Sequence, residues 1–279
     1  MTRRTVRELL WGSAILFGPS QPDGFGFALY GPSGASAWGR YRSPDAFKGF
    51  CESGAGCQEG GSIPATTTLL MVHGRTSTNE RGLANAHPFR TGPRGRQRFL
   101  VHNGVLRWAG QGRDPNAAVA CDSDRFARWY EAGGTPKLAA ESWSGYGAIG
   151  LLDTDPASAG MTVLKCPTVS LYAAIFPHDG PATILSTIPS DAIVMARQAG
   201  HSQTGTTKMP ASVCRYGPDG RLVAYEEWGG FRSMAWGWEV EQSIGVTAPA
   251  PKPSRRGRAR LKPAREFVEQ DAFPFYAYR

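Results

Sequence analysis

Apolar and polar residues alternate along this chain in many short stretches, a pattern typical of β-strands. We expect nine strands, at residues 24–30, 35–41, 67–73, 99–102, 146–152, 171–175, 183–187, 213–216 and 222–226. Glycine- and proline-containing turns at residues 31–34 and 217–220 separate two pairs of these segments and predict β-hairpins.

Three longer segments have helical character, at residues 5–17, 123–132 and 190–199. Ser123 and Ser190 are suitable N-cap residues, and each has an aspartate in the following turn. Because strands and helices do not alternate regularly, we expect an α+β protein with mainly antiparallel sheets.

The composition is that of a folded protein. The chain has 279 residues, of which 41% are hydrophobic and 19% charged, so a core can form and the composition argues against global disorder. The five cysteines are irregularly spaced, which argues against a disulfide framework. Cys51 and Cys57 have no second ligand pair at similar spacing, so we expect free thiols, no metal and no cofactor.

The first residues loosely mimic a signal peptide, since Arg3, Arg4 and Arg7 precede an apolar run at residues 9–17. No clean small-x-small cleavage site follows this run. It is also shorter than the roughly 20 apolar residues that span a bilayer. We therefore expect a buried helix, a cytoplasmic protein and no membrane partner.

The composition changes near residue 245, which we take as the end of a domain at residues 1–245. Residues 246–266 contain four prolines and seven lysines or arginines, typical of an extended basic linker. Residues 267–279 form an aromatic tail that is expected to dock on this domain or on a partner. The basic residues also make nucleic acid a candidate partner, although this indication rests on the linker alone.

Three polar segments carry the candidate chemistry: His73-Gly-Arg-Thr-Ser-Thr-Asn79, Asn85-Ala-His-Pro-Phe89 and Val101-His-Asn-Gly104. Taken singly, Arg75 would be a solvated surface charge and His87 an ordinary turn residue. The Asn-Gly pair alone would indicate a β-turn. Their joint order and spacing are much less expected by chance.

Together these segments resemble the class II glutamine amidotransferases, a branch of the N-terminal-nucleophile hydrolases. Residues 22–28 are similar to the family's Asp-Gly-Trp-Gly-Ile strand, and residues 122–126 to its Ser-Asp-Thr-Glu helix start. The resemblance covers about residues 5–227. It implies a four-layer αββα sandwich of two mainly antiparallel sheets.

The resemblance also implies how glutamine would be bound. Arg75 would bind the substrate carboxylate, which a guanidinium fork suits, and Thr78 would add a hydrogen bond. Asp124 would be the counter-charge of the α-ammonium group. We therefore expect these residues to converge on one cleft with the oxyanion-binding residues.

The oxyanion hole implied by the resemblance consists of the Asn103 side-chain amide and the Gly104 N–H group. Glycine at position 104 would let the backbone approach the substrate closely. His87 would support the loop and not act as a base, because the free α-amine of the nucleophile serves as base in this enzyme class.

The chain departs from the family at the nucleophile, which in the family is a cysteine that opens an apolar strand. Here Met1, Thr2 and Arg3 lead directly into the first expected helix. Three explanations stay open: a start codon misplaced downstream of a cysteine, a glutaminase-dead protein, or catalysis by Thr2. Loss of the strand is expected to leave an open sheet edge unless residues 1–4 or 273–278 fill it.

The function implied by the resemblance is hydrolysis of glutamine to glutamate, with ammonia passed to an acceptor. A separate synthetase or acceptor enzyme is then the expected partner, and modification of nucleotides or 7-deazaguanine bases is one setting. The alternative is a catalytically dead protein that uses the glutamine pocket for binding or as a scaffold.

Overall fold

A computed structural model of the chain defines the fold. It describes residues 1–52, 62–76, 83–93, 95–111, 114, 116, 118–119, 121–175, 182–198, 205–232 and 274–278. The expected basic linker and Thr78 lie outside these residues. In the described part, no helix is long and apolar enough to cross a membrane.

The larger sheet has seven antiparallel strands in the order β10-β8-β9-β13-β3-β1-β2. In chain order they are β1 (Gly24–Tyr30), β2 (Ser36–Tyr41), β3 (Leu69–Arg75), β8 (Tyr172–Ile175), β9 (Ala182–Ser186), β10 (Gly205–Lys208) and β13 (Pro274–Tyr278). The segments that form this sheet come from both ends of the chain.

The smaller sheet has six antiparallel strands in the order β12-β11-β7-β6-β5-β4. They are β4 (Phe89–Thr91), β5 (Arg98–Trp108), β6 (Trp143–Asp153), β7 (Gly160–Lys165), β11 (Ser212–Tyr216) and β12 (Leu222–Glu227). Most neighbours in this sheet are also neighbours in the sequence.

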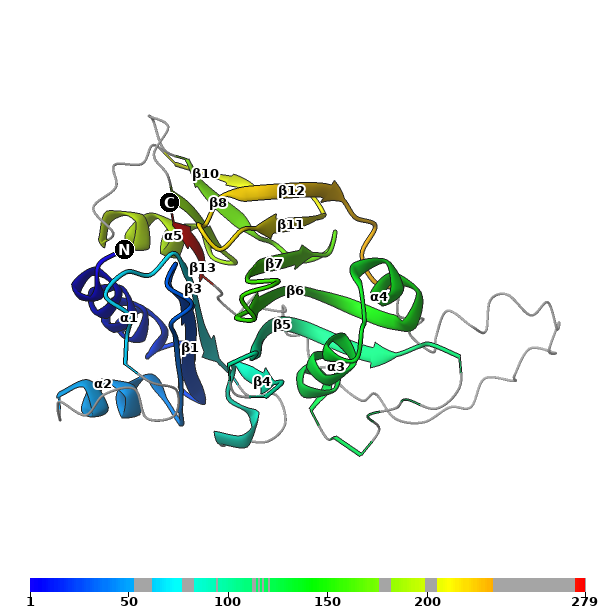
Figure 1. The fold of residues 1–279 in the computed structure, drawn as a ribbon, viewed down its shortest axis with the longest axis horizontal. Helices are drawn as coiled ribbons and strands as arrows, with labels where there is room; N and C mark the ends of the chain where they lie inside the picture. Colours follow the sequence, from blue (N-terminus) through cyan, green and yellow to red (C-terminus); the bar gives the residue numbers. More distant parts are fainter. Residues whose placement is uncertain are drawn as a thin grey trace, which may run out of the picture.

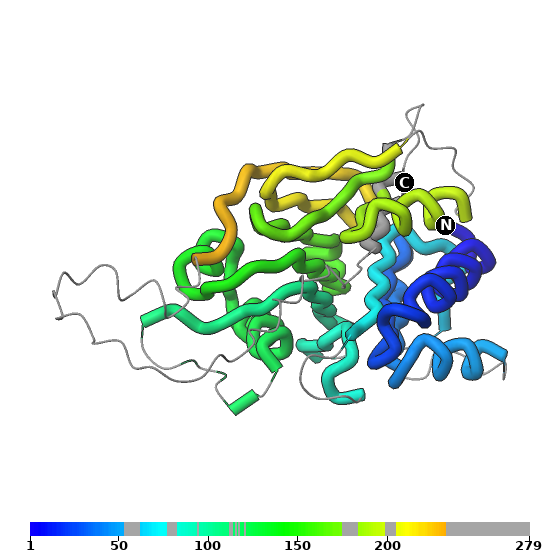
Figure 2. The backbone as a smooth tube through the Cα atoms, turned by 180° about the vertical axis from the view of Figure 1, so that it is seen from behind, coloured from blue at the N-terminus to red at the C-terminus, as the bar shows by residue number. Residues whose placement is uncertain are grey.

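Helices cover the outer faces of both sheets (Figure 1). One hydrophobic cluster joins the seven-stranded sheet to α1 (Arg3–Phe17), α2 (Pro44–Glu52) and α5 (Pro189–Gln198). Another joins the six-stranded sheet to α3 (Asp122–Glu131) and α4 (Pro136–Ser142). A third lies between the two sheets. Figure 2 shows the same layers from behind. The structure is thus a mixed α and β fold with two antiparallel sheets, as the strand pattern predicts.

Strand alternation decides which side chains face the space between the sheets. On β3, Leu70 and Val72 pack with the outer helices, whereas Leu69 and Met71 pack between the sheets. Arg75 continues the Leu69–Met71 series and therefore lies on the inter-sheet face. By the same alternation, Phe99 and Val101 of β5 face the other sheet, and Asn103 continues their series.

The aromatic end of the chain lies inside the larger sheet. Strand β13 pairs with β3 through Phe275 and Met71, and on its other side with β9 through Phe275 and Leu185. It runs antiparallel to β3, so its N-terminal end points toward the Arg75 end of that strand. Residues 274–278, within one of the two segments expected to fill an open edge, therefore form an inner strand of this sheet.

The first residues of the chain lie at the opposite end of β3. The Met1 ammonium group donates a hydrogen bond to the Thr67 carbonyl at 2.7 Å, and Thr2 pairs with Thr66. The Thr2 hydroxyl accepts a bond from the Thr5 N–H group at 3.2 Å and caps α1. About 20 Å of strand separates Leu69 from Arg75 at the usual rise per residue.

Both expected hairpins are present, β1–β2 and β11–β12. The sequence pattern did not reveal α2, α4, β4, β7, β10 or β13. The predicted N-caps Ser123 and Ser190 are both wrong. Helix α3 begins at Asp122, and the Ser123 hydroxyl contacts His102 instead, while α5 begins at Pro189. Asn103 and Gly104 lie inside the long strand β5, not in a turn.

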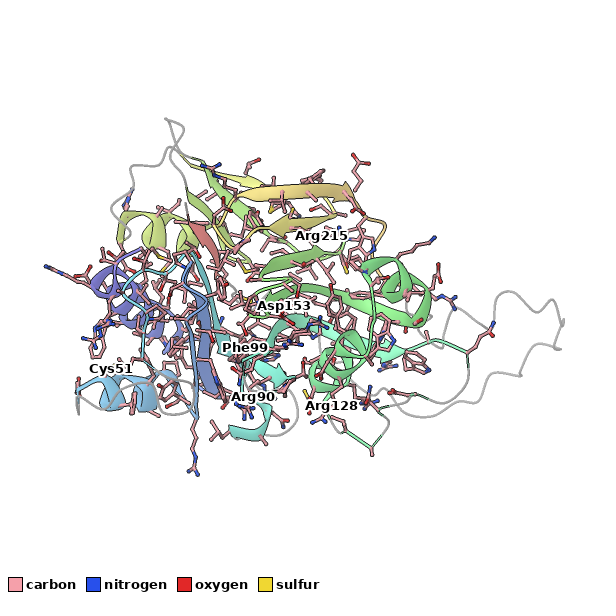
Figure 3. The ribbon with its side chains drawn as sticks, viewed as in Figure 1. Cys51, Arg90, Phe99, Arg128, Asp153 and Arg215 are labelled. Carbon is pink, nitrogen blue, oxygen red and sulfur yellow. The ribbon has the colours of Figure 1, made fainter. Side chains whose placement is uncertain are left out.

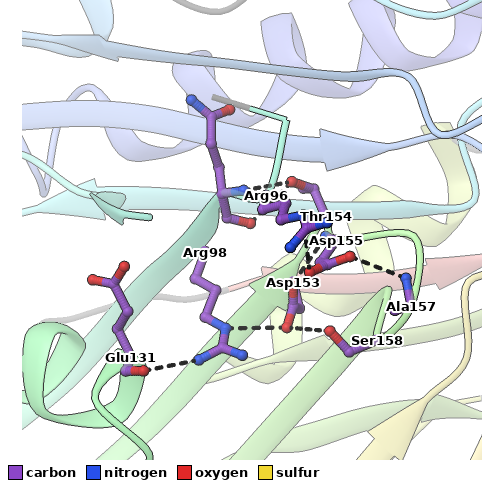
Figure 4. A network of polar contacts seen from close by, with 9 residues as sticks. Arg96, Arg98, Glu131, Asp153, Thr154, Asp155, Ala157 and Ser158 are labelled. Atoms are coloured by element: carbon purple, nitrogen blue, oxygen red, sulfur yellow. Dashed lines mark hydrogen bonds and ion pairs between the residues drawn. The ribbon is translucent and has the colours of Figure 1, made fainter. Parts of the chain in front are cut away.

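A polar network fixes the first end of β5 (Figure 4). The Arg98 guanidinium donates to Asp153 on the neighbouring strand at 3.1 Å and to the Glu131 carbonyl at the end of α3 at 3.4 Å. Ser158 donates to the same Asp153 carboxylate at 2.9 Å. The network therefore links the start of β5 to the end of β6 and to the end of α3.

Candidate functional site

Two glycines of β1 allow the segment with His87 to lie against the sheet. Gly24 pairs with Arg75, and a side chain at position 24 would meet the Cβ atoms of Arg75 and Ala86 at 3.3 and 3.4 Å. A side chain at Gly26 would clash with the carbonyl oxygen of His87. The Asp-Gly-Phe-Gly motif thus places the half-buried Arg75 beside the segment that contains His87.

The Asn103-Gly104 pair lies at the middle of β5, opposite Ala148 and Gly147 of β6. Gly104 has φ +140°, and a side chain there would clash with the Tyr146 carbonyl oxygen. Only glycine fits this backbone without strain. Both residues are partly exposed.

Three buried histidines connect the strands that carry Arg75 and Asn103. The rings of His73 and His87 lie 4.1 Å apart, and His102 contacts Ser123 through Nδ1 at 3.0 Å. Burial lowers the pKa of His73 to about 3 and that of His87 well below 6.5, and neighbouring cationic groups act in the same direction. These rings are neutral at pH 7, and the supporting role of His87 stays a prediction.

The first turn of α3 is bonded to β5 next to the candidate oxyanion hole. The Asp122 carboxylate accepts hydrogen bonds from the Leu106 N–H group at 2.9 Å and from the Ser123 N–H group at 2.8 Å. This link positions α3 relative to Gly104. Sequence reasoning assigned Asp122 no role, although the residue opens the helix-start motif.

Asp124 already has a charged partner in this structure. Its two carboxylate oxygens accept bonds from the Arg128 guanidinium, one turn further along α3, at 3.0 and 3.3 Å. The Asp124 side chain is 20% exposed and that of Arg128 is 53% exposed. Ion pairs this exposed contribute only about 0–1 kcal/mol, so an incoming ammonium group can compete with Arg128 at small cost.

Asp124 also lines a cavity of about 660 Å³, within the size range of small-molecule sites. The cavity lies where β2 and β4, the edge strands of the two sheets, approach α3. Its lining residues are Trp38, Arg40, Ala84, Phe89, Arg90, Asp124 and Arg128. Figure 3 shows Arg90 and Arg128 at this edge of the molecule. Arg75, Asn103 and Gly104 are not among the lining residues.

The structure does not bring every predicted residue to this region. Thr78 lies outside the described residues. Thr2 lies at the far end of β3, where it caps α1, so the prediction that it acts as the nucleophile does not fit the geometry.

No described cysteine thiol has the lowered pKa of an activated nucleophile. Burial raises the pKa of each of the four described thiols, which belong to Cys51, Cys121, Cys166 and Cys214.

Comparison with known structures gives two informative likenesses of fold. The allosteric regulatory enzyme of purine biosynthesis superposes with a TM-score of 0.55 at 14% identity, covering 79% of this chain and 46% of that one. Glutamine phosphoribosylpyrophosphate amidotransferase from B. subtilis, complexed with ADP and GMP, gives a TM-score of 0.51 with the same identity and coverage.

This chain spans less than half the length of either structure. No protein-family model and no curated protein matches the sequence. At 14% identity the likeness concerns the fold alone, and at that level it confirms the resemblance to a glutamine amidotransferase.

Proposed function

We propose that this chain binds glutamine and hydrolyses it to glutamate in the manner of class II glutamine amidotransferases. The observation that carries the proposal is the Asn103-Gly104 pair. The pair lies within β5, on the strand that faces the Arg75 strand across the two sheets, and Gly104 has a backbone conformation that only glycine tolerates.

The binding step uses charges on both sides of this region. The Arg75 guanidinium is a planar fork that matches the two oxygens of the glutamine carboxylate. Asp124 receives the α-ammonium group in place of Arg128. Glutamine is a zwitterion, so one cation and one anion match its charge.

In the hydrolysis step, a nucleophile attacks the carbon of the glutamine side-chain amide. The carbonyl oxygen gains negative charge, which the Asn103 amide and the Gly104 N–H group stabilise by hydrogen bonding. The nucleophile becomes acylated and gives up its proton to the leaving nitrogen, which departs as ammonia. Water then hydrolyses the acyl bond, which releases glutamate and restores the nucleophile. Ammonia passes to a separate acceptor enzyme, with modification of nucleotides or 7-deazaguanine bases as one setting.

A second candidate function is glutamine binding without hydrolysis. Its support is the position of the candidate nucleophile Thr2 at the far end of β3, together with the raised pKa of every described thiol. A protein of this kind retains the pocket and responds to glutamine through a partner.

Calorimetry with glutamine, combined with an assay of glutamate release, separates the two functions. We expect Arg75→Gln to weaken glutamine binding at least tenfold, roughly the 1.4 kcal/mol of one charge-assisted hydrogen bond. Arg4→Gln, on the outer face of α1, should leave binding unchanged. Turnover near 1 per second or faster would establish the enzyme. Binding without turnover would establish the second function, and absence of glutamine binding would exclude both.

A further inference from the structure

Two arginines in the cavity lie on the same tryptophan. The Arg90 guanidinium carbon is 5.0 Å from the centre of the Trp38 ring, and that of Arg40 is 5.9 Å from it. Arg40 comes from β2 and Arg90 from β4, so the pair joins the edges of the two sheets. Trp38 is only 4% exposed and packs against Phe99 at 5.8 Å, which fixes the position of its ring.

Neither arginine is neutralised by the described part of the protein. Among those residues, neither guanidinium has a hydrogen bond or an ion pair, and the Nε atom of Arg40 is buried without an acceptor. By contrast, Arg98 and Arg125 are each paired with an aspartate. Two like charges held around one ring, with no counter-charge among the described residues, favour an anionic ligand.

The charges around the cavity do not match those of an amino acid. Among the described residues, the lining contains Arg40, Arg90 and Arg128 but only one carboxylate, that of Asp124. Asp124 and Arg128 neutralise each other, so a net charge of +2 remains on Arg40 and Arg90. A zwitterionic amino acid cannot balance this charge.

We propose that Arg40 and Arg90 form an anion subsite for a phosphate-bearing small molecule. A guanidinium fork binds two oxygens of one phosphate, and two forks match the charge of a phosphate monoester dianion. The cavity of about 660 Å³ also has more room than an amino acid of ten heavy atoms needs. The subsite is independent of glutamine hydrolysis and extends the site beyond the proposed function.

The test is calorimetry of the full chain with inorganic phosphate, pyrophosphate and a nucleoside 5′-monophosphate. We expect Arg40→Gln and Arg90→Gln each to weaken binding at least tenfold and the double variant to abolish it. Arg4→Gln is the matched control, because it removes a positive charge from a distant helix. Equal weakening in all three single variants would show general electrostatic attraction and overturn the subsite, as would absence of binding at millimolar phosphate.

Three further measurements separate loss of the phosphate subsite from misfolding, from nucleic-acid binding and from loss of glutamine binding. Arg40→Lys keeps the charge but removes the fork, so it should fold with an unchanged melting temperature and still lose phosphate affinity. A single-stranded oligonucleotide provides the other source of phosphate. Binding of the oligonucleotide with no binding of the monophosphate would overturn a small-molecule site. Glutamine affinity of the double variant should change less than twofold, so failure of the subsite and failure of the proposed function are distinguishable.

Discussion

The two sheets of this protein are built in different ways. In the six-stranded sheet, β4 to β7 follow one another in space as they do in sequence, and β11 and β12 complete it as a hairpin. In the seven-stranded sheet, β13 from the end of the chain separates β3 from β9. The first sheet depends mainly on local pairing, whereas the second depends on contact between residues about 200 positions apart.

This difference matters for the candidate site, because each sheet contributes one side of it. The seven-stranded sheet supplies Arg75 at the end of β3, and the six-stranded sheet supplies Asn103 and Gly104 in the middle of β5. We therefore expect perturbations of the two sheets to have different consequences, as follows.

The largest loss of folding stability is expected from removing residues 274–279. The facing edges of β3 and β9 then lose their partner strand, and unpaired edges expose backbone groups and promote aggregation. The expected loss is most of a folding free energy that is about 5–15 kcal/mol for a typical domain. Urea denaturation followed by circular dichroism measures it.

Removal of Arg279 alone is the control for this truncation and should leave the melting temperature unchanged. A synthetic peptide of residues 272–279 added to the truncated protein should restore cooperative unfolding. If the truncated and complete chains melt together, the two halves of the seven-stranded sheet do not depend on β13.

A smaller loss of folding stability is expected from Gly104→Ala in the six-stranded sheet. The new methyl group meets the Tyr146 carbonyl oxygen at a φ of +140°, so we expect a loss of about 2–4 kcal/mol. Gly34→Ala is the matched control, since Gly34 has φ +81° but nothing within 4 Å, and should cost about 1 kcal/mol. Equal costs in chemical denaturation would show that β5 relaxes around position 104.

The buried histidines near β3 and β5 predict loss of stability in acid. The pKa of His73 falls from 6.5 to about 3 on folding, so the unfolded chain binds the extra proton between these values. The free energy of unfolding should therefore be highest above pH 6.5 and fall toward pH 3, by up to about 1.4 kcal/mol per pH unit for one histidine.

His87→Phe should make this dependence on pH shallower, because it removes a second ring whose pKa is lowered by burial. Both ring nitrogens of His87 lack a hydrogen-bond partner among the described residues, so the apolar ring leaves no new polar atom unsatisfied. Urea denaturation at several pH values measures the slope. A slope equal to that of the natural chain would assign the acid sensitivity to other groups.

The smallest effect is expected from Arg128→Gln. This change frees the Asp124 carboxylate, so an α-ammonium group no longer competes with an ion pair worth about 0–1 kcal/mol, and glutamine should bind up to about fivefold more tightly. Arg125→Gln, whose partner is Asp114, is the control on the same helix. Weaker glutamine binding in calorimetry would instead mean that Arg128 itself contacts the ligand.

Local sequence patterns were informative where neighbouring residues decide the structure. The hairpins β1–β2 and β11–β12, helix α1 and the bounds of β1 follow from alternation and turn residues. The motifs around Arg75, His87 and Asn103 also indicated the fold that the comparisons confirm. In contrast, Asn-Gly at 103 and 104 has the local preference of a turn, and only pairing with β6 makes it part of a strand.

The sequence by itself determined the alternating faces of the strands, the glycines that admit the His87 segment, and the charges of the candidate site. The tertiary structure decided that the aromatic end of the chain completes the larger sheet, and that Thr2 lies far from Arg75. It also brought Arg40 and Arg90 onto one buried tryptophan. These arrangements depend on contacts between segments that are distant in the sequence. Such contacts form only when the whole chain packs, and the conformational preferences of neighbouring residues do not determine them.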